Sequence, residues 1–157
     1  MRRSRKTDWM RRLVRENSLS SNDFILPIFV TEGKNKKIPI KTMPEVFRYS
    51  VDKLSHIVDR ALKLKIPMVA IFPQTNSGLK DTYGSEALYE NNLVCKAIRK
   101  IKDKYKNEIG IMTDVALDPY TSHGHDGILR NKRILNDETR EILIQQSLLQ
   151  AQMGSDV

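Results

Sequence analysis

The stretch SVDKLSHIVDRALKLKIPMVAIFP (residues 50–73) holds the pattern of a helix followed closely by that of a strand. Apolar side chains recur at helical spacing from residue 54 onward, and Ser50 is a candidate N-cap. Pro67 lies just past this segment, where helices commonly stop, and residues 68–73 form a continuous apolar run with the length of a buried strand. A helix joined to a buried strand by a short turn predicts a parallel α/β sheet.

The rest of the chain repeats this alternation. Residues 24–30 and 109–117 predict two further buried strands, and residues 91–105 and 136–154 predict two further helices, the last with Asn136 or Asp137 as N-cap and Gly154 at its end. Residues 31–49 are expected to be a polar connection. Strands this apolar suit a sheet covered on both faces. About three βα units are too few to close an eight-stranded barrel, and residues 155–157 are expected to begin another strand, as though the chain were cut there.

Composition argues against several classes of partner. The net charge is +8, but the basic residues are spread along the chain and aromatic residues make up only 6%, so we expect no nucleic-acid binding. No apolar run approaches the roughly 18 residues of a membrane span, so no membrane insertion is expected. The single cysteine, Cys95, lies on the apolar stripe of its helix, and no apolar signal segment follows the basic N-terminus. We therefore expect a core thiol and a cytoplasmic protein.

Residues 114–129, DVALDPYTSHGHDGIL, concentrate the groups that carry chemistry. Asp114 lies near the end of the third predicted strand, and Asp118 follows four residues later. His123, His125 and Asp126 then lie in a glycine-containing loop. Imidazole and carboxylate groups at this spacing suit a metal site or an acid–base site. A polar loop with internal hydrogen bonds fits the spacing as well.

The same stretch resembles the porphobilinogen synthase family, also called 5-aminolevulinate dehydratase. Five other stretches fall in the family's order: RRSR…WMRRLVREN, DFILPIFVTEG, MPEVFRYSVDKL, VAIFPQ and GSEA. The resemblance runs from Arg2 to Val157 and corresponds to the N-terminal half of the family's chain. It implies an N-terminal arm (1–22) and about three βα units of a TIM (β/α)8 barrel (23–157), incomplete at the C-terminus.

The resemblance implies a lyase that condenses two molecules of 5-aminolevulinate into porphobilinogen, with loss of two waters, in tetrapyrrole and haem biosynthesis. The family's two Schiff-base lysines belong to later strands, and Lys80 is interpreted as a solvated charge. The chain alone is therefore expected to lack turnover. The alternative is a non-catalytic half-barrel that acts through subunit association. Family members form octamers or hexamers through the arm, where Trp9 either anchors in a neighbour's groove or packs against its own barrel.

The resemblance also bears on metals. Zinc-dependent members carry three cysteines at the positions of Ala116, Asp118 and Asp126, and this replacement predicts Mg²⁺, or K⁺, and no catalytic zinc here. Asp118 and Asp126 are candidate metal ligands or, alternatively, acid–base and orienting groups for the second substrate's amine. Asp114 matches a family active-site aspartate that we assign to orienting substrate and catalytic groups.

Two smaller expectations concern local geometry. The histidines of the loop, like Ser122, are assigned loop shape and hydrogen bonding before any catalytic role. Glu45 stands where the family commonly has glycine, so a turn there is expected to be disturbed.

Overall fold

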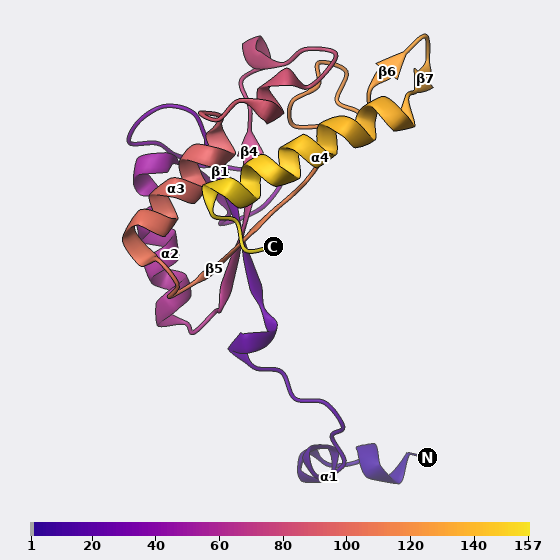
Figure 1. Cartoon of the computed structure of the whole chain (residues 1–157). Coiled ribbons are helices and arrows are strands. Elements are labelled where there is room, and N and C mark those ends of the chain that lie inside the picture. Colours follow the sequence, from indigo (N-terminus) through magenta and orange to yellow (C-terminus); the bar gives the residue numbers. More distant parts are fainter. Residues whose placement is uncertain (1) are drawn as a thin grey trace.

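The computed structural model describes residues 2–157 and is built on a five-stranded sheet of order β2-β3-β1-β4-β5 (Figure 1). Neighbouring strands are parallel except β2 and β3, which are antiparallel. A separate short hairpin joins β6 and β7. The strands are β1 (Ile25–Thr31), β2 (Lys37–Pro39), β3 (Phe47–Ser50), β4 (Met68–Gln74), β5 (Gly110–Thr113), β6 (Leu129–Arg130) and β7 (Arg133–Ile134).

The three predicted helices are confirmed, and a short one is added in the arm. The helices are α1 (Asp8–Leu13), α2 (Leu54–Lys63), α3 (Leu93–Tyr105) and α4 (Asn136–Met153). Gly154 ends α4 with a left-handed φ of 108°, as predicted. None of these helices is long and apolar enough to cross a membrane.

The predicted N-caps form no side-chain capping bonds, although Ser50 does occupy the N-cap position of the 3-10 turn that leads into α2. The backbone N–H of Lys36 donates to Ser50 Oγ at 2.8 Å, and a 3-10 turn (Val51–Lys53) separates Ser50 from α2. Helix α4 begins at Asn136, after Leu135, without a side-chain cap. At the start of α2, the Ser50 hydroxyl bonds to the Lys36 backbone instead of to the first turn of the helix.

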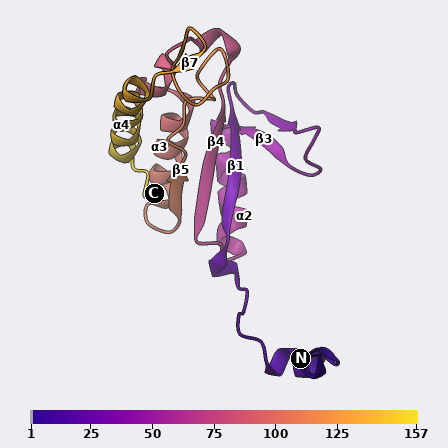
Figure 2. The same ribbon diagram turned by 90° about the vertical axis from the view of Figure 1, so that its right-hand side faces the viewer.

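The main core lies between the sheet and helices α2 and α3, which Figure 2 shows alongside the strands. Because side chains alternate across a strand, Ile28 and Val30 of β1 face the same side as Val69 and Ile71 of β4. All four are at most 1% exposed. Each such side chain stabilises the fold by about 1.5–3 kcal/mol relative to an exposed position.

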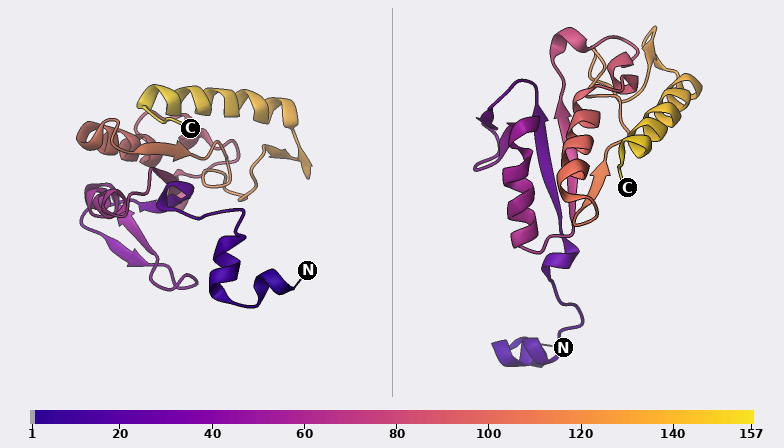
Figure 3. Two further views of the ribbon diagram at one scale, coloured as in Figure 1. Left: turned by 90° about the horizontal axis from the view of Figure 1, so that it is seen from below. Right: turned by 60° about the vertical axis from the view of Figure 1, so that its left-hand side comes forward.

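The opposite face of the sheet is not covered by helices within residues 2–157, contrary to the prediction that both faces are covered. Phe29 and Phe72 project to that side with their ring centroids 5.8 Å apart, and both rings line a cavity. Helix α4 lies beside α3 and β5 (Figure 3). Among residues 2–157, helices thus cover one face and leave the other open to the site.

Two strand assignments need correction. Residues 31–49 were expected to be a polar connection, but they contain β2 and the start of β3. Phe47 and Tyr49 alternate with polar residues there, which is the pattern of a half-buried strand. The third predicted strand is also shorter, since β5 ends at Thr113. Ala116 and Leu117 instead follow the strand as buried residues, and Leu117 belongs to a second core cluster with Ala87, Tyr120 and Ile128.

The turn between α2 and β4 shows why the helix stops. The Ile66 N–H donates to the Ala61 carbonyl at 3.0 Å, and the Lys65 N–H donates to the Leu62 carbonyl at 2.9 Å. Lys65 has a φ of 58°. These two bonds form a Schellman motif, which satisfies the last helical carbonyls and leads the chain directly into the strand.

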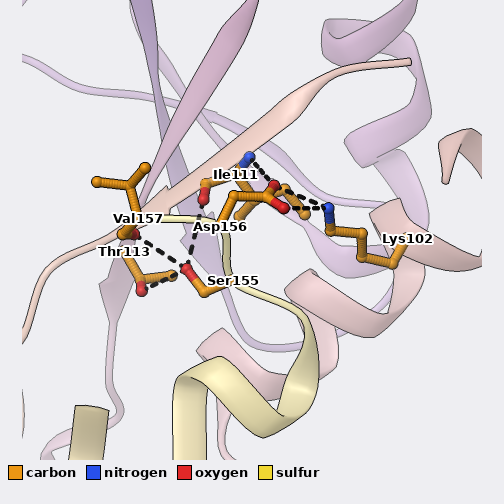
Figure 4. Close-up of polar contacts among 6 residues, drawn as sticks. All are labelled: Lys102, Ile111, Thr113, Ser155, Asp156 and Val157. Carbon is orange, nitrogen blue, oxygen red and sulfur yellow. Dashed lines mark hydrogen bonds and ion pairs between the residues drawn. The ribbon is translucent and has the colours of Figure 1, made fainter. Parts of the chain in front are cut away.

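Residues 155–157 lie along the outer edge of β5, as expected for the start of another strand (Figure 4). The Val157 N–H donates to the Ile111 carbonyl at 3.1 Å, and the Thr113 N–H donates to the Val157 carbonyl at 2.9 Å. The Asp156 carboxylate accepts from the Ile111 N–H at 2.8 Å and from Lys102 Nζ at 2.7 Å. Partial burial acts to raise the pKa of Asp156, but the bonds from Lys102 and Ile111 outweigh it and lower this pKa.

The N-terminal segment extends away from the sheet (Figures 1 and 2). Trp9 is 57% exposed, and Leu13 and Leu19 are 77% and 76% exposed. Trp9 is therefore not buried against the part of the barrel that residues 23–157 form, and packing against its own barrel stays a prediction. Anchoring in a neighbour's groove stays a prediction.

Glu45 has a φ of 63°, a left-handed conformation that glycine adopts without strain. We expect Glu45→Gly to raise the free energy of unfolding by about 0.5–1 kcal/mol, since relief of strain exceeds the added entropy of the unfolded chain. Urea denaturation followed by circular dichroism measures the change. Glu45→Ala, which removes the charge but keeps Cβ, is the control. Equal stability of the glycine and alanine variants would contradict the strain argument.

Candidate functional site

A cavity of about 360 Å³ opens at the carboxyl ends of the parallel strands. Its apolar side is formed by the Phe29 and Phe72 rings, and two cationic side chains, Arg48 and Lys80, reach it from β3 and from the loop after β4. Asp114 and Asp118, which follow β5, complete its wall. Sites of parallel α/β proteins lie at this end of the sheet because the loops that follow the strands meet there.

Asp118 carries the clearest electrostatic signature of the predicted residues. Its pKa is raised, first by partial burial and then by the negative charges of Asp126 and Asp114, while Lys80 acts in the opposite direction. Repulsion of this kind places Asp114 and Asp126 within electrostatic range of Asp118. Asp114 and Asp118 line the cavity, whereas Asp126 lies beside them and is not among the lining residues.

Asp126 reaches this group from the returning loop. Its Oδ1 accepts a hydrogen bond from the Leu117 N–H at 2.6 Å, which ties residue 126 to the segment between Asp114 and Asp118. The side chain of Asp126 is otherwise exposed. Ala116 is 6% exposed and offers no ligand atom.

The two loop histidines hold the shape of the loop, as predicted. His123 Nδ1 accepts from the His125 N–H at 3.2 Å, and His125 Nδ1 accepts from the Gly127 N–H at 2.9 Å. The Thr121 hydroxyl donates to the His125 carbonyl at 2.8 Å. These bonds occupy the Nδ1 atom of each ring within the loop.

Lys80 differs from its interpretation as a solvated charge, because it is partly buried and lines the cavity with Asp118. Sequence analysis also missed Arg48 and Thr75. Arg48 lies on β3, the overlooked strand, and Thr75 follows β4 directly. Thr75 is 9% exposed, and its buried hydroxyl has no hydrogen-bond partner among the described residues. The rule that sites gather just after parallel strands would have selected Thr75.

The donor atoms bear on which ion fits here. No group of three or more His, Cys, Asp or Glu side chains within residues 2–157 is arranged to hold a metal ion. The carboxylates of Asp118 and Asp126 supply hard oxygen donors and no thiolate. Mg²⁺ keeps several waters and uses one or two carboxylates, so these oxygen donors are of the type that hydrated Mg²⁺ prefers, whereas residues 114–126 contain no thiolate of a cysteine zinc site.

The parallel sheet, its long loops at the carboxyl ends and its acidic site define part of a TIM barrel. A family model described as delta-aminolevulinic acid dehydratase matches residues 1–157, and the chain belongs to this family.

Relatives agree along nearly the whole chain. The delta-aminolevulinic acid dehydratase of Bradyrhizobium diazoefficiens is 52% identical over 99% of this chain and 44% of its own length. That of Chlamydia pneumoniae is 42% identical over 99% of this chain and 47% of its own length. The crystal structure of the Toxoplasma gondii enzyme, in complex with the reaction product porphobilinogen, matches with a TM-score of 0.89 at 33% identity, covering 99% of this chain and 44% of that one. The chain thus spans about half the length of these relatives.

The repulsion at Asp118 generates a prediction. Because folding raises its pKa above that of the unfolded chain, Asp118 contributes stability at low pH and loses it as pH rises through the raised pKa. Asp126→Asn keeps an acceptor for the Leu117 N–H but removes one like charge, so the pKa of Asp118 should fall. Carboxyl ¹³C NMR titration measures this pKa. Asp137→Asn, at the exposed start of α4, is the control. An unchanged Asp118 titration in Asp126→Asn would show that the carboxylates do not interact.

Proposed function

We propose that the chain serves the condensation of two molecules of 5-aminolevulinate into porphobilinogen, with loss of two waters, as the N-terminal half of a porphobilinogen synthase barrel. The observation that carries the proposal is the family match over residues 1–157. The similarity to the Toxoplasma gondii product complex supports it.

The three aspartates are assigned supporting roles in this reaction. Asp114 orients substrate and catalytic groups at the end of β5. Asp118 and Asp126 attract a cation, either the ammonium group of the second substrate or hydrated Mg²⁺, with K⁺ as the alternative. A bound Mg²⁺ would supply positive charge and oriented water. The raised pKa of Asp118 supports this assignment, since a cation relieves the repulsion that causes it.

The chain by itself is proposed to lack turnover, because the family's Schiff-base lysines belong to later strands. Association into homo-oligomers, octamers or hexamers in the family, is assigned to the arm. The exposed side chains of Trp9, Leu13 and Leu19 support this assignment. Cytoplasmic location is part of the same proposal. It is supported by Cys95, which is 0% exposed and whose thiol pKa is raised by burial, as suits a reduced core cysteine.

A non-catalytic role in subunit association is the second candidate. It is favoured by the sheet face that carries Phe29 and Phe72, which no helix covers within residues 2–157. Such a half-barrel would act by pairing with another chain through its open face and its arm.

The test mixes the purified chain with the C-terminal part of the Bradyrhizobium diazoefficiens relative, 5-aminolevulinate and Mg²⁺, and assays the pyrrole product colorimetrically. We expect no product from either part alone and product from the mixture. Asp118→Ala should reduce the rate of the mixture at least about tenfold, through loss of charge stabilisation. Glu108→Ala, in the turn before β5, should leave the rate unchanged.

Light scattering on the same samples separates the two candidates. A complex that forms without product favours the non-catalytic role. Product from the chain alone would refute the proposed lack of turnover.

A further inference from the structure

Helix α4 buries two glutamines and exposes two aliphatic side chains. Gln146 and Gln150 are 0% and 3% exposed, whereas Ile144 and Leu148 are 44% and 57% exposed. A helix that packs through the hydrophobic effect alone shows the reverse arrangement. Burial of an amide costs free energy unless its hydrogen bonds are replaced. The glutamines therefore contribute something other than apolar burial.

Their amide groups bond to the backbone that follows β5. Gln150 Nε2 donates to the Asp114 carbonyl at 3.2 Å, and Gln146 Nε2 donates to the Ala116 carbonyl at 3.1 Å. Gln150 Oε1 also accepts from the Thr113 hydroxyl at 3.0 Å. Four residues of helix and two residues of extended chain both advance about 6–7 Å. The two glutamine donors on α4 therefore match the spacing of the Asp114 and Ala116 carbonyls. These carbonyls follow Thr113, the last residue of β5 that pairs with β4.

One peptide group is held at both ends. The carbonyl of Ala116 accepts from Gln146, and the N–H of the same peptide, on Leu117, donates to Asp126 Oδ1 at 2.6 Å. Leu117 is 0% exposed. Hydrogen bonds in series through one peptide strengthen each other away from water. Gln146 therefore acts on Asp126 through this peptide without touching it.

Stability alone does not explain Gln146. Its Oε1 is buried and has no partner among the described residues. An unsatisfied buried acceptor destabilises the folded state, and an apolar side chain of similar shape would avoid that cost. What an apolar residue would lose is the bond to the Ala116 carbonyl.

We infer that Gln146 and Gln150 are positioning residues that fix the backbone of residues 114–117, and so direct Asp114 and Asp118 toward the cavity and hold Asp126 beside them. What the aspartates do in catalysis rests on the proposed function. The hydrogen bonds themselves do not, so the two ideas can fail separately.

The first test replaces Gln146 with methionine, which has a similar shape but no donor. In the 157-residue chain, the Leu117 amide should exchange its hydrogen about tenfold faster or more, while the amides of α3 keep their rates. The Asp118 pKa should also fall as the carboxylates separate. Gln145→Met, at the exposed neighbouring position, should change neither. Leu117 exchange and Asp118 titration both unchanged in a folded Gln146→Met chain would overturn the inference.

A second measurement needs no substitution and decides the matter if Gln146→Met fails to fold. NMR coupling across the hydrogen bond should be detected between the Gln146 side-chain nitrogen and the Ala116 carbonyl carbon. The exposed Gln145 side chain serves as the control and should show no such coupling. Absence of the Gln146 coupling in the folded chain would overturn the inference.

Discussion

The parallel pairing of β1 with β4 over residues 25–31 and 68–74 is the constraint on which the rest of the chain depends. It aligns the ends of the two strands and places β3 and β5 on either side. Because successive side chains of a strand point to opposite faces, Ile28 and Val30 face the helix-covered core and Phe29 faces the cavity. If this register slipped by one residue, every side chain of β1 would change face, and both the core and the cavity would be lost.

The position of the site is set by the residue at which the pairing of β5 with β4 ends. The ladder of β5 ends at Thr113, so Asp114 and the residues after it leave the sheet and need other partners. Helix α4 and Asp126 supply them, and residues 155–157 occupy the edge that β5 presents. Three negative charges are thereby held near a cavity that also receives Arg48 and Lys80. Charges of both signs around one opening suit a small substrate that carries an ammonium and a carboxylate group.

The sequence predicts the elements with strong periodicity and misses those that depend on distant partners. Strands β1 and β4 and helices α2, α3 and α4 were found because their apolar runs are long. Strand β3 was missed because it is only four residues long and lies between two pairing partners, β1 and β2, that its own sequence does not reveal. The capping bond of Ser50 was mispredicted because the backbone N–H of Lys36, 14 residues earlier, donates to the Ser50 hydroxyl. Likewise, the aspartates were identified from their motif, whereas Lys80 and the buried glutamines were not. Their roles come from contacts across the fold.

The central claim is that Asp114 and Asp118 face one opening at the carboxyl ends of the strands and that Asp126 lies beside them. A crystal structure of the chain tests it most directly. We expect the carboxyl groups of Asp114 and Asp118 at the cavity with Lys80 at its wall, and the Asp126 carboxylate bonded to the Leu117 N–H beside them. A structure in which Asp118 or Asp126 lies on the face covered by α2 and α3 would contradict the account.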